Sequence, residues 1–208
     1  MSNGNNSIRS INLDEWYQSG EGATAVSYFN KNDDSIMLKL FTGSVTASNY
    51  ANREFEFSKH VEACNVKTPK ALEIVSANGQ LGVIYERIKD KVSFSKLCHD
   101  NPEKIEEYAT EFAMELKSLH CLKCDSEFFT GINETIKRCI SSSKVYHNLS
   151  KRRLFSFMDE LGDEQVCIHG DAHSGNLIKA NGSNYWIDLG AFTYGSHWYD
   201  IGGVYFFY

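Results

Sequence analysis

The sequence has few prolines, no long apolar run and no excess of positive charge, and each absence excludes a class of protein. Two prolines among 208 residues exclude a proline-rich linker. No stretch approaches the roughly 18 apolar residues of a membrane span, and the polar N-terminus lacks the apolar centre of a secretory signal. The net charge of −6 argues against binding through bulk electrostatics to nucleic acid. We therefore expect neither a nucleic-acid nor a membrane partner.

What is present is the composition of a globular protein. Hydrophobic residues make up 42% and charged residues 23%, which excludes a disordered or fibrous chain. The length suits one compact domain or two small lobes that share a cleft. Without an export signal, we expect a cytoplasmic protein with reduced thiols. The six cysteines are Cys64, Cys98, Cys121, Cys124, Cys139 and Cys167.

The first third of the sequence predicts a small β-rich lobe with one helix. Strands are expected at residues 15–19, 25–29 and 36–41, with a hairpin formed by 71–76 and 81–86. A helix is expected from about residue 46 to 64, because side chains recur there at spacings of four and three. Its inward face consists of Tyr50, Glu54, Phe57, Val61 and Cys64.

The rest of the sequence predicts a mainly helical lobe, and residues 86–92 are the expected connector. One helix begins at Asn101, a possible N-cap, with Pro102 at its first position. Its apolar stripe consists of Ile105, Tyr108, Phe112, Leu116 and Leu119. One or two further helices are expected within 135–161, a strand at 166–168, and a hairpin formed by 177–179 and 185–187.

The segment from Ile168 to Leu177 carries most of the chemistry, because three polar side chains stand between two apolar runs. These are Asp171, His173 and Asn176, and Asp188 follows the hairpin. Two carboxylates and an amide oxygen are hard ligands of the kind that Mg²⁺ prefers. Two alternatives remain at this point: a polar turn beside a surface hairpin, and a zinc hydrolase cluster of His169, Asp171 and His173.

The run His169-Gly-Asp171-x-His173-x-x-Asn176, followed by Ile187-Asp188-Leu-Gly190, resembles the signature of the aminoglycoside phosphotransferase and choline kinase family. The resemblance implies an α+β, two-lobed protein-kinase-like fold, with a small antiparallel sheet and one helix in the N-lobe. It further implies a mainly helical C-lobe with a catalytic hairpin. The expected domains are residues 1–88 for nucleotide binding and 89–208 for catalysis.

The resemblance also implies roles for these residues. Asp171 would accept the proton of the acceptor hydroxyl, and Asn176 and Asp188 would hold Mg²⁺. His173, in the catalytic loop, and His169 would organise the loop by hydrogen bonding. Asp200 is similar to a later aspartate of the family that braces the catalytic loop.

The same resemblance places a nucleotide site in the N-terminal third. Ser19–Thr24 is similar to an abbreviated glycine-rich loop with Gly20 and Gly22, although a plain hairpin turn would also explain these glycines. Lys39 lies within an apolar strand and Glu54 lies on the inward face of a helix, where a charged side chain needs a partner of opposite charge. Alternatively, Lys39 lies on an exposed face of its strand. Pairing of Lys39 with Glu54 would reproduce the lysine–glutamate pair of kinases.

The connector at residues 85–89 matches the hinge of the family. Adenine would bind backbone groups there, contributed by Glu86 and Ile88. ATP, or GTP in its place, and Mg²⁺ are the expected cofactors.

The leading hypothesis is a small-molecule kinase, with an aminoglycoside, choline or ethanolamine, a sugar or an amino alcohol as the acceptor. A nucleotide-binding scaffold without turnover is the alternative. Family members continue with further helices after the segment around Asp200, whereas this sequence stops at Tyr208. A minimal member, a shortened chain and a tail covered by a partner all remain open. Cys121-x-x-Cys124 is interpreted as two ordinary thiols, because no second pair follows at metal-binding spacing.

Overall fold

The computed structural model describes residues 8–22, 24–42, 47–145, 147–162 and 164–207. The chain divides into two compact units. The N-terminal unit comprises Met1–Glu62 and Pro69–Asp90, and the C-terminal unit comprises Ala63–Thr68 and Lys91–Tyr208. None of the described helices is long and apolar enough to cross a membrane.

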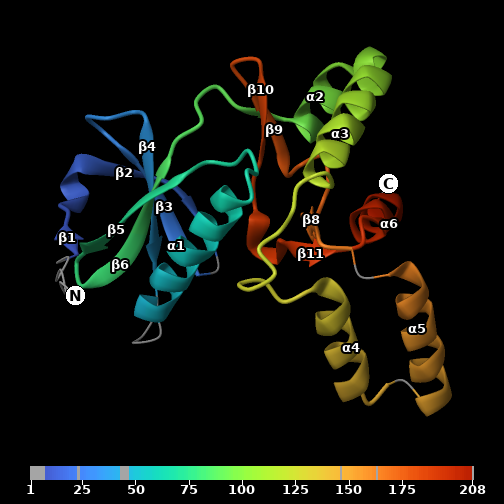
Figure 1. Ribbon diagram of the computed structural model, residues 1–208. Helices are drawn as coiled ribbons and strands as arrows, with labels where there is room; N and C mark the ends of the chain where they lie inside the picture. Colours follow the sequence, from blue (N-terminus) through green and yellow to red (C-terminus); the bar gives the residue numbers. More distant parts are fainter. Residues whose placement is uncertain (1–7, 23, 43–46, 146, 163, 208) are drawn as a thin grey trace. The chain divides into compact units, whose positions relative to one another are not determined.

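The N-terminal unit is a six-stranded sheet with one helix against it (Figure 1). The strand order is β1-β5-β6-β4-β3-β2, and only the β1–β5 pair is parallel among the pairs described. The strands are β1 (Arg9–Ser10), β2 (Trp16–Glu21), β3 (Ala25–Asn30), β4 (Ile36–Phe41), β5 (Ala71–Ala77) and β6 (Gln80–Glu86). The helix is α1 (Ala47–Ala63), and a short 3₁₀ turn, η1 (Leu13–Glu15), precedes β2.

Alternation along β4 explains how the sheet buries both of its faces. Leu38 and Leu40 point to one face and pack in a cluster with Trp16 and Val75. Phe41 points to the opposite face and packs with another cluster that includes Ala51 of α1. Lys39 therefore lies on the same face as the helix, where an acidic side chain of α1 can reach it.

The C-terminal unit combines small sheets with helices (Figure 1). A three-stranded sheet has the order β10-β9-β7, and β11 pairs with β8 in an antiparallel ladder. The strands are β7 (Val92–Ser93), β8 (Val166–Ile168), β9 (Leu177–Ala180), β10 (Ser183–Trp186) and β11 (Thr193–Gly195). The helical segments are α2 (Phe94–Asp100), η2 (Pro102–Lys104), α3 (Ile105–Leu119), α4 (Ile132–Ser142), α5 (Asn148–Leu161), η3 (Leu189–Ala191) and α6 (Trp198–Phe207).

The predicted fold class is confirmed, and most predicted elements lie within two residues of the observed ones. The segment expected to hold one or two helices holds two, α4 and α5, and α4 begins three residues earlier than the predicted segment. The expected start of α1 at residue 46 lies outside the described residues.

Two details of the predicted stripes are wrong. Tyr50 and Ile105 were expected to face inward, yet 52% and 53% of their surfaces are exposed. Both lie in the first turn of their helices, where the apolar stripe begins. The start of the third helix also differs, because Pro102 opens a 3₁₀ turn and the α-helix starts at Ile105. The Asn101 side chain makes no cap hydrogen bond to that turn.

Candidate active site

The catalytic candidates of the C-terminal unit lie in the loop that follows β8 and in the turn that follows β10 (Figure 1). Ile168 and Leu177 are completely buried at the two ends of the loop. These apolar anchors hold a polar segment between them, as the sequence predicts. The loop is also tied to the second segment, because the Ile187 backbone N–H donates to the Asn176 carbonyl oxygen at 2.9 Å.

His169 is a buried part of the loop scaffold. Its Nδ1 accepts a hydrogen bond from the Asp171 backbone N–H at 3.3 Å, so the ring proton is on Nε2. Nε2 then donates to the carbonyl oxygen of Ile187 at 3.1 Å. Burial lowers the pKa of His169, and this outweighs the negative charge of Asp200, which would raise it. The ring is therefore neutral near pH 7. Both ring nitrogens are occupied, which argues against the zinc cluster of His169, Asp171 and His173.

Asp200 holds the first two residues of the loop by their backbone. Asp200 is buried, with 1% of its surface exposed. Its carboxylate accepts hydrogen bonds from the backbone N–H groups of His169 and Gly170, each at 2.8 Å. The same carboxylate contacts Nε2 of His120 at 2.9 Å, and because a carboxylate only accepts, His120 is the donor. Three donors thus compensate the burial of one negative charge.

Asp171 and Asn176 lie side by side in the loop. The Asn176 side-chain amide donates to the backbone oxygen of Asp171 at 3.0 Å and approaches its carboxylate at 3.4 Å. This fixes the amide so that its oxygen, Oδ1, is directed away from Asp171. The Asp171 side chain is 46% exposed, whereas Asn176 is buried. A substrate can therefore reach the carboxylate, while the amide is held in place.

His173 lies beside the same carboxylate. Its Nδ1 accepts from the Gly175 backbone N–H at 3.0 Å, which leaves the proton on Nε2. Nε2 is 3.9 Å from the Asp171 carboxylate, beyond hydrogen-bond distance. A Cβ on Gly175 would lie 2.8 Å from the His173 ring, so only glycine permits this close turn.

Asp188 lies two residues after the end of β10. It has a left-handed backbone conformation, with φ 57° and ψ 50°, an arrangement that aspartate tolerates better than most residues. The residue is exposed and begins the 3₁₀ turn η3. The conformation turns the chain sharply after the hairpin, and the exposed carboxylate has no hydrogen bond or ion pair with the residues that the structure describes.

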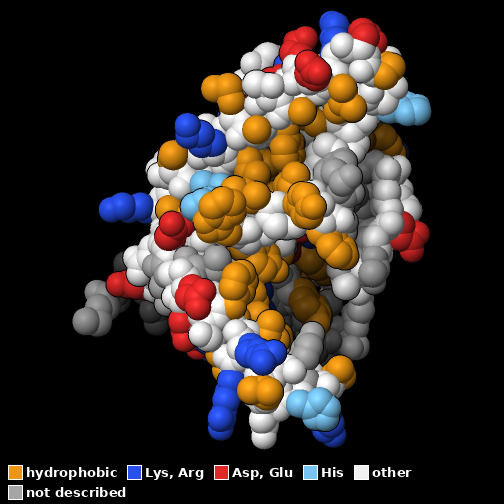
Figure 2. Space-filling view, turned by 90° about the vertical axis from the view of Figure 1, so that its right-hand side faces the viewer, with side chains coloured by type: hydrophobic (Ala, Val, Ile, Leu, Met, Phe, Trp, Pro, Cys, Tyr) orange, Lys and Arg blue, Asp and Glu red, His pale blue; other side chains and the backbone are white. Residues whose placement is uncertain are grey.

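A cavity of about 560 Å³ opens beside Asp171. Its lining includes Asp171, Ala172 and Ser196, together with aromatic residues of α5 and α6 such as Phe157 and Trp198. Figure 2, seen from the side where these helices lie, shows hydrophobic side chains gathered around a hollow. Exposed aromatic surface beside an accessible carboxylate is typical of a binding site for a small molecule.

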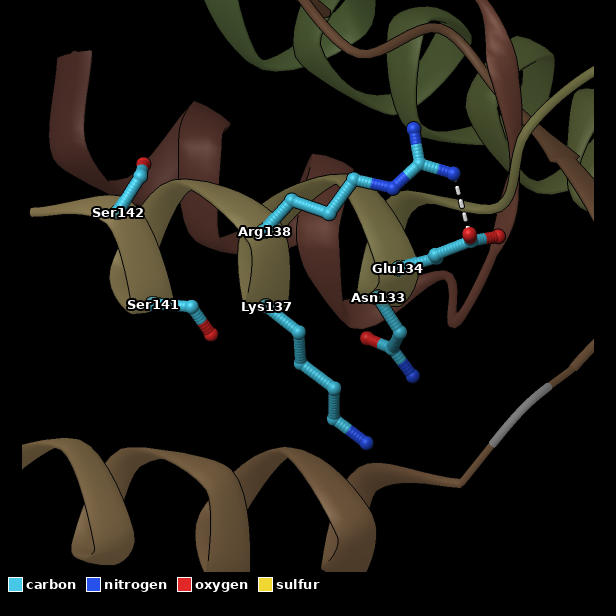
Figure 3. A pocket seen from close by; sticks show the side chains of 6 residues that line it. All are labelled: Asn133, Glu134, Lys137, Arg138, Ser141 and Ser142. Atoms are coloured by element: carbon cyan, nitrogen blue, oxygen red, sulfur yellow. Dashed lines mark hydrogen bonds and ion pairs between the residues drawn. The ribbon is translucent and has the colours of Figure 1, made fainter.

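A second hollow, of about 760 Å³, lies along α4 (Figure 3). Its charged side chains already have partners within the chain. Lys137 contacts Asp159 at 2.6 Å, and Arg138 pairs with Glu134 one turn earlier. We therefore assign no chemistry to it.

The N-terminal unit contains the predicted ion pair. Nζ of Lys39 lies 2.5 Å from Oε1 of Glu54, between β4 and α1. The sequence did not predict the contribution of Tyr85, whose hydroxyl donates to the same Glu54 oxygen at 3.2 Å. Burial, followed by the charge of Glu54, raises the pKa of Tyr85, which keeps the hydroxyl protonated as a donor. The sequence predicts Tyr85 near the end of a hairpin strand, where the connector begins, and nothing in the local sequence signals its contact with α1.

The predicted glycine-rich loop is shorter than expected. β2 extends to Glu21, so Gly20 lies within the strand, at a register shift between Gln18 and Gly20. Gly22 forms the turn, where its N–H donates to the Ala25 oxygen at 2.8 Å. Residue 23, in the middle of the predicted loop, lies outside the described residues.

Two backbone N–H groups of the connector are already engaged within the N-terminal unit. The Glu86 N–H already donates to Lys70 at 2.9 Å and the Arg87 N–H to Ser35 at 2.7 Å. The described backbone hydrogen bonds include none from the Ile88 N–H. Of the two predicted adenine contacts, Ile88 can donate through its backbone, whereas Glu86 can take part through its carbonyl oxygen.

Comparison with known proteins identifies the family of the chain. The phosphotransferase enzyme family matches residues 18–208. The chain belongs to this family. Its predicted enzyme class, a small-molecule kinase with an alcohol group as acceptor, is confirmed. A search of curated proteins finds no significant match.

Solved structures share the fold at low sequence identity. An aminoglycoside-3'-phosphotransferase of type VIII is 16% identical with a TM-score of 0.54, and the match covers 92% of this chain and 76% of that one. The amicoumacin kinase hAmiN is 15% identical with a TM-score of 0.57, covering 95% and 65%. A choline/ethanolamine kinase family protein from Mesorhizobium loti is 14% identical with a TM-score of 0.56, covering 91% and 62%.

Proposed function

We propose that the protein transfers the γ-phosphate of ATP to the hydroxyl group of a small molecule, with Asp171 as the general base. The observation that carries this proposal is the position of the half-exposed Asp171 carboxylate, held beside Asn176 and lining a cavity. The alternative, a scaffold without turnover, predicts loss of the base or of a metal ligand. All of these groups are present in the loop and in the turn after the hairpin. We also keep the expectation of a cytoplasmic protein.

Asp171 would accept the proton of the acceptor hydroxyl and orient its oxygen toward the phosphate. The backbone around it is restrained from both sides. His169 accepts from the Asp171 N–H, and Asn176 donates to the Asp171 carbonyl oxygen. These bonds hold the backbone of Asp171 in place, and the carboxylate lines the cavity. Such restraint favours a reactive geometry before the substrate arrives.

Asn176 and Asp188 are the residues that would hold Mg²⁺. The donor set fits, because one amide oxygen and one carboxylate are hard ligands, and Mg²⁺ completes its shell with phosphate oxygens and water. The structure supports this assignment through the Asn176 amide, whose nitrogen is engaged with Asp171 and whose oxygen is therefore available. When bound, the cation would neutralise charge that develops on the transferred phosphoryl group.

In the N-terminal unit, Lys39 would bind the α- and β-phosphates of the nucleotide. Glu54 keeps the ammonium group of Lys39 in place, and Tyr85 in turn holds Glu54. We place adenine on the backbone of Glu86 and Ile88, and the phosphates near the Gly20–Gly22 turn. We propose ATP as the phosphate donor; GTP would contact the same backbone groups and the same lysine.

The cavity beside Asp171 favours an acceptor with an apolar or singly charged surface. Its charged lining consists of Asp171 and Asp200, and Asp200 is already bound by three donors. Trp198 and Phe206 offer exposed aromatic faces, which attract quaternary ammonium groups. Among the expected acceptors, we rank choline and similar amino alcohols above sugars and aminoglycosides.

The function is tested by measuring ADP release from Mg²⁺·ATP with a panel of these alcohols. Asp171→Asn should lower kcat by roughly 100- to 10,000-fold, because the amide cannot take a proton. Asp159→Asn is the matched control, since it makes the same change in an exposed surface pair. Full turnover by the Asp171→Asn protein would contradict the assignment of the base.

The metal assignment needs a separate measurement of thermal unfolding with and without Mg²⁺·ATP. A ligand that binds only the folded protein stabilises it by about 2.7 kcal/mol at a hundredfold excess over its dissociation constant. We expect this stabilisation to require Mg²⁺ and to disappear in Asp188→Ala. Stabilisation by nucleotide without turnover of any acceptor would favour the scaffold instead. An aminoglycoside as the best acceptor would contradict only our ranking of acceptors.

A further inference from the structure

Three of the six cysteines come together in the C-terminal unit, although they are distant in the sequence. The sulfur atoms of Cys64, Cys124 and Cys167 all lie within 4.8 Å of one another. Cys64 and Cys167 are buried, at 6% and 0% exposure, and Cys124 is partly exposed. Neither the phosphoryl transfer nor the Mg²⁺ site proposed above uses this cluster.

The backbone fixes two of the three side chains on one face. Lys123 and Val166 form an antiparallel bridge, so the residues that follow them in the chain point to the opposite side. Hydrogen bonds on either side of the bridge hold this register: Cys124 N–H to Gln165 at 3.3 Å, and Cys167 N–H to Leu122 at 2.9 Å. Cys124 and Cys167 therefore share a face.

The third cysteine comes from another part of the chain. Cys64 directly follows α1 and belongs to the short segment Ala63–Thr68 that the C-terminal unit includes. The backbone N–H of Asp125 donates a hydrogen bond to its sulfur. The cluster thus already contains a backbone donor directed at sulfur.

The dimensions of the cluster suit a thiophilic cation. A triangle with sides of 4.8 Å has its centre about 2.8 Å from each corner, which is an upper limit for these sulfurs. Zinc–thiolate bonds are about 2.3 Å long, so a contraction of about half an ångström would complete the site. Buried cysteines often serve as small apolar side chains, but that role does not require three sulfurs to meet at one point.

We propose that Cys64, Cys124 and Cys167 form a thiolate site for a soft d¹⁰ cation, with Zn²⁺ as the reference ion. Soft thiolate ligands select Zn²⁺ and Cu⁺ over the hard Mg²⁺ of the phosphoryl-transfer site. Binding displaces the thiol protons to solvent and leaves three sulfur–metal bonds. Because Cys167 lies in β8, four residues before Asp171, the cation would secure the strand that leads into the catalytic loop.

The first test counts protected thiols in the full chain, reduced and freed of metal beforehand. Alkylation followed by peptide mapping is carried out with and without one equivalent of Zn²⁺. We expect Zn²⁺ to slow the alkylation of the three cluster cysteines and to leave Cys98, Cys121 and Cys139 unchanged. Equal reactivity with and without Zn²⁺ would overturn the proposal. Elemental analysis of protein purified without added metal separates Zn²⁺ from Cu⁺.

The second test titrates Cd²⁺ and follows the sulfur-to-metal charge-transfer absorption. We expect one equivalent of Cd²⁺ to bind. Loss of a residue that only supports a metal ligand costs roughly 10- to 100-fold in metal affinity, so the loss of a ligand in Cys124→Ser should weaken binding by at least as much. Cys124 is chosen because it is partly exposed, so the fold tolerates its change best. Cys121→Ser is the matched control, because Cys121 is exposed and lies outside the cluster.

Two outcomes of the titration would overturn the proposal. Loss of binding in Cys121→Ser as well as in Cys124→Ser would assign the ion to the Cys-x-x-Cys pair. Equal binding by the Cys124→Ser and unchanged proteins would assign it elsewhere. Neither measurement depends on nucleotide or acceptor, so failure here leaves the proposed kinase activity untouched.

Discussion

The buried carboxylate of Asp200 accepts a hydrogen bond from the backbone N–H of His169 at 2.8 Å, across thirty-one positions of sequence. The contact joins the start of α6 to the start of the catalytic loop. The carboxylate of Asp200 holds the backbone N–H groups of His169 and Gly170, and together with His120 these three donors compensate its negative charge. The orientation of the loop should therefore depend on a residue that lies outside the loop, in α6.

Replacement of that carboxylate tests the dependence. Asp200→Asn removes the charge and replaces one of the two carboxylate oxygens by an NH₂ donor, which then faces either the Gly170 N–H or the His169 N–H with His120. We expect a loss of about 3 kcal/mol in the free energy of unfolding, measured by urea denaturation. The control is Asp159→Asn, which should stay within about 0.5 kcal/mol, since its pair is on the surface. Equal stability of the two variants would show that Asp200 does not brace the loop.

A second prediction separates the binding role of Lys39 from any structural role. The Lys39 and Glu54 side chains are 35% and 36% exposed, so solvent screens their pairing. Lys39→Met should change the free energy of unfolding by no more than about 1 kcal/mol. Turnover should fall by roughly 100- to 1,000-fold, because a donor to the phosphates is lost. Severe unfolding with nucleotide affinity unchanged would assign the pair to stability instead.

The sequence was sufficient for the residues whose positions local rules determine. The helical period placed Glu54 on the inward face of α1, and Lys39, within an apolar strand, was its expected partner; the two side chains form an ion pair. The loop from His169 to Asn176 was found from the spacing of its polar residues. In each case a short stretch of sequence contains the whole geometric argument.

The remaining contacts join segments whose proximity no local pattern encodes. Tyr85 reaches Glu54 from β6, and His120 reaches Asp200 from the end of α3. The cysteine cluster is the clearest example. Spacing drew attention to Cys121 and Cys124, whereas the structure groups Cys124 with two cysteines that lie more than forty residues away. Short elements such as α2 and β11 were not predicted, because they contain too few residues to show a helical or alternating pattern of apolar side chains.

Gly170 provides a test of how tightly the loop is packed. Its φ is +81°, and a Cβ at this position would lie 2.2 Å from the carbonyl oxygen of Ala191. Gly170→Ala should lower the free energy of unfolding by about 1–3 kcal/mol. It should also lower kcat, because the loop that carries Asp171 must move to make room for the Cβ. Gly190→Ala is the matched control, because no atom lies within 4 Å of its added Cβ. Thermal unfolding of both variants measures the difference, and equal melting temperatures would contradict this packing.

The buried neutral His169 predicts how stability changes with pH. Burial holds its folded pKa below the value of about 6.5 that the unfolded chain should show. Between these two values the unfolded state binds the extra proton, so stability is full above about pH 6.5 and is lost as the pH falls toward the folded pKa. His169→Gln removes this titration and should flatten the decline between about pH 7 and pH 5. Urea denaturation across this range measures the slopes, with His147→Gln, at an exposed histidine, as the control. If the slope for His169→Gln equals that of the unchanged protein, the folded histidine takes up its proton as readily as the unfolded one, and its ring nitrogens are not held in the loop as described.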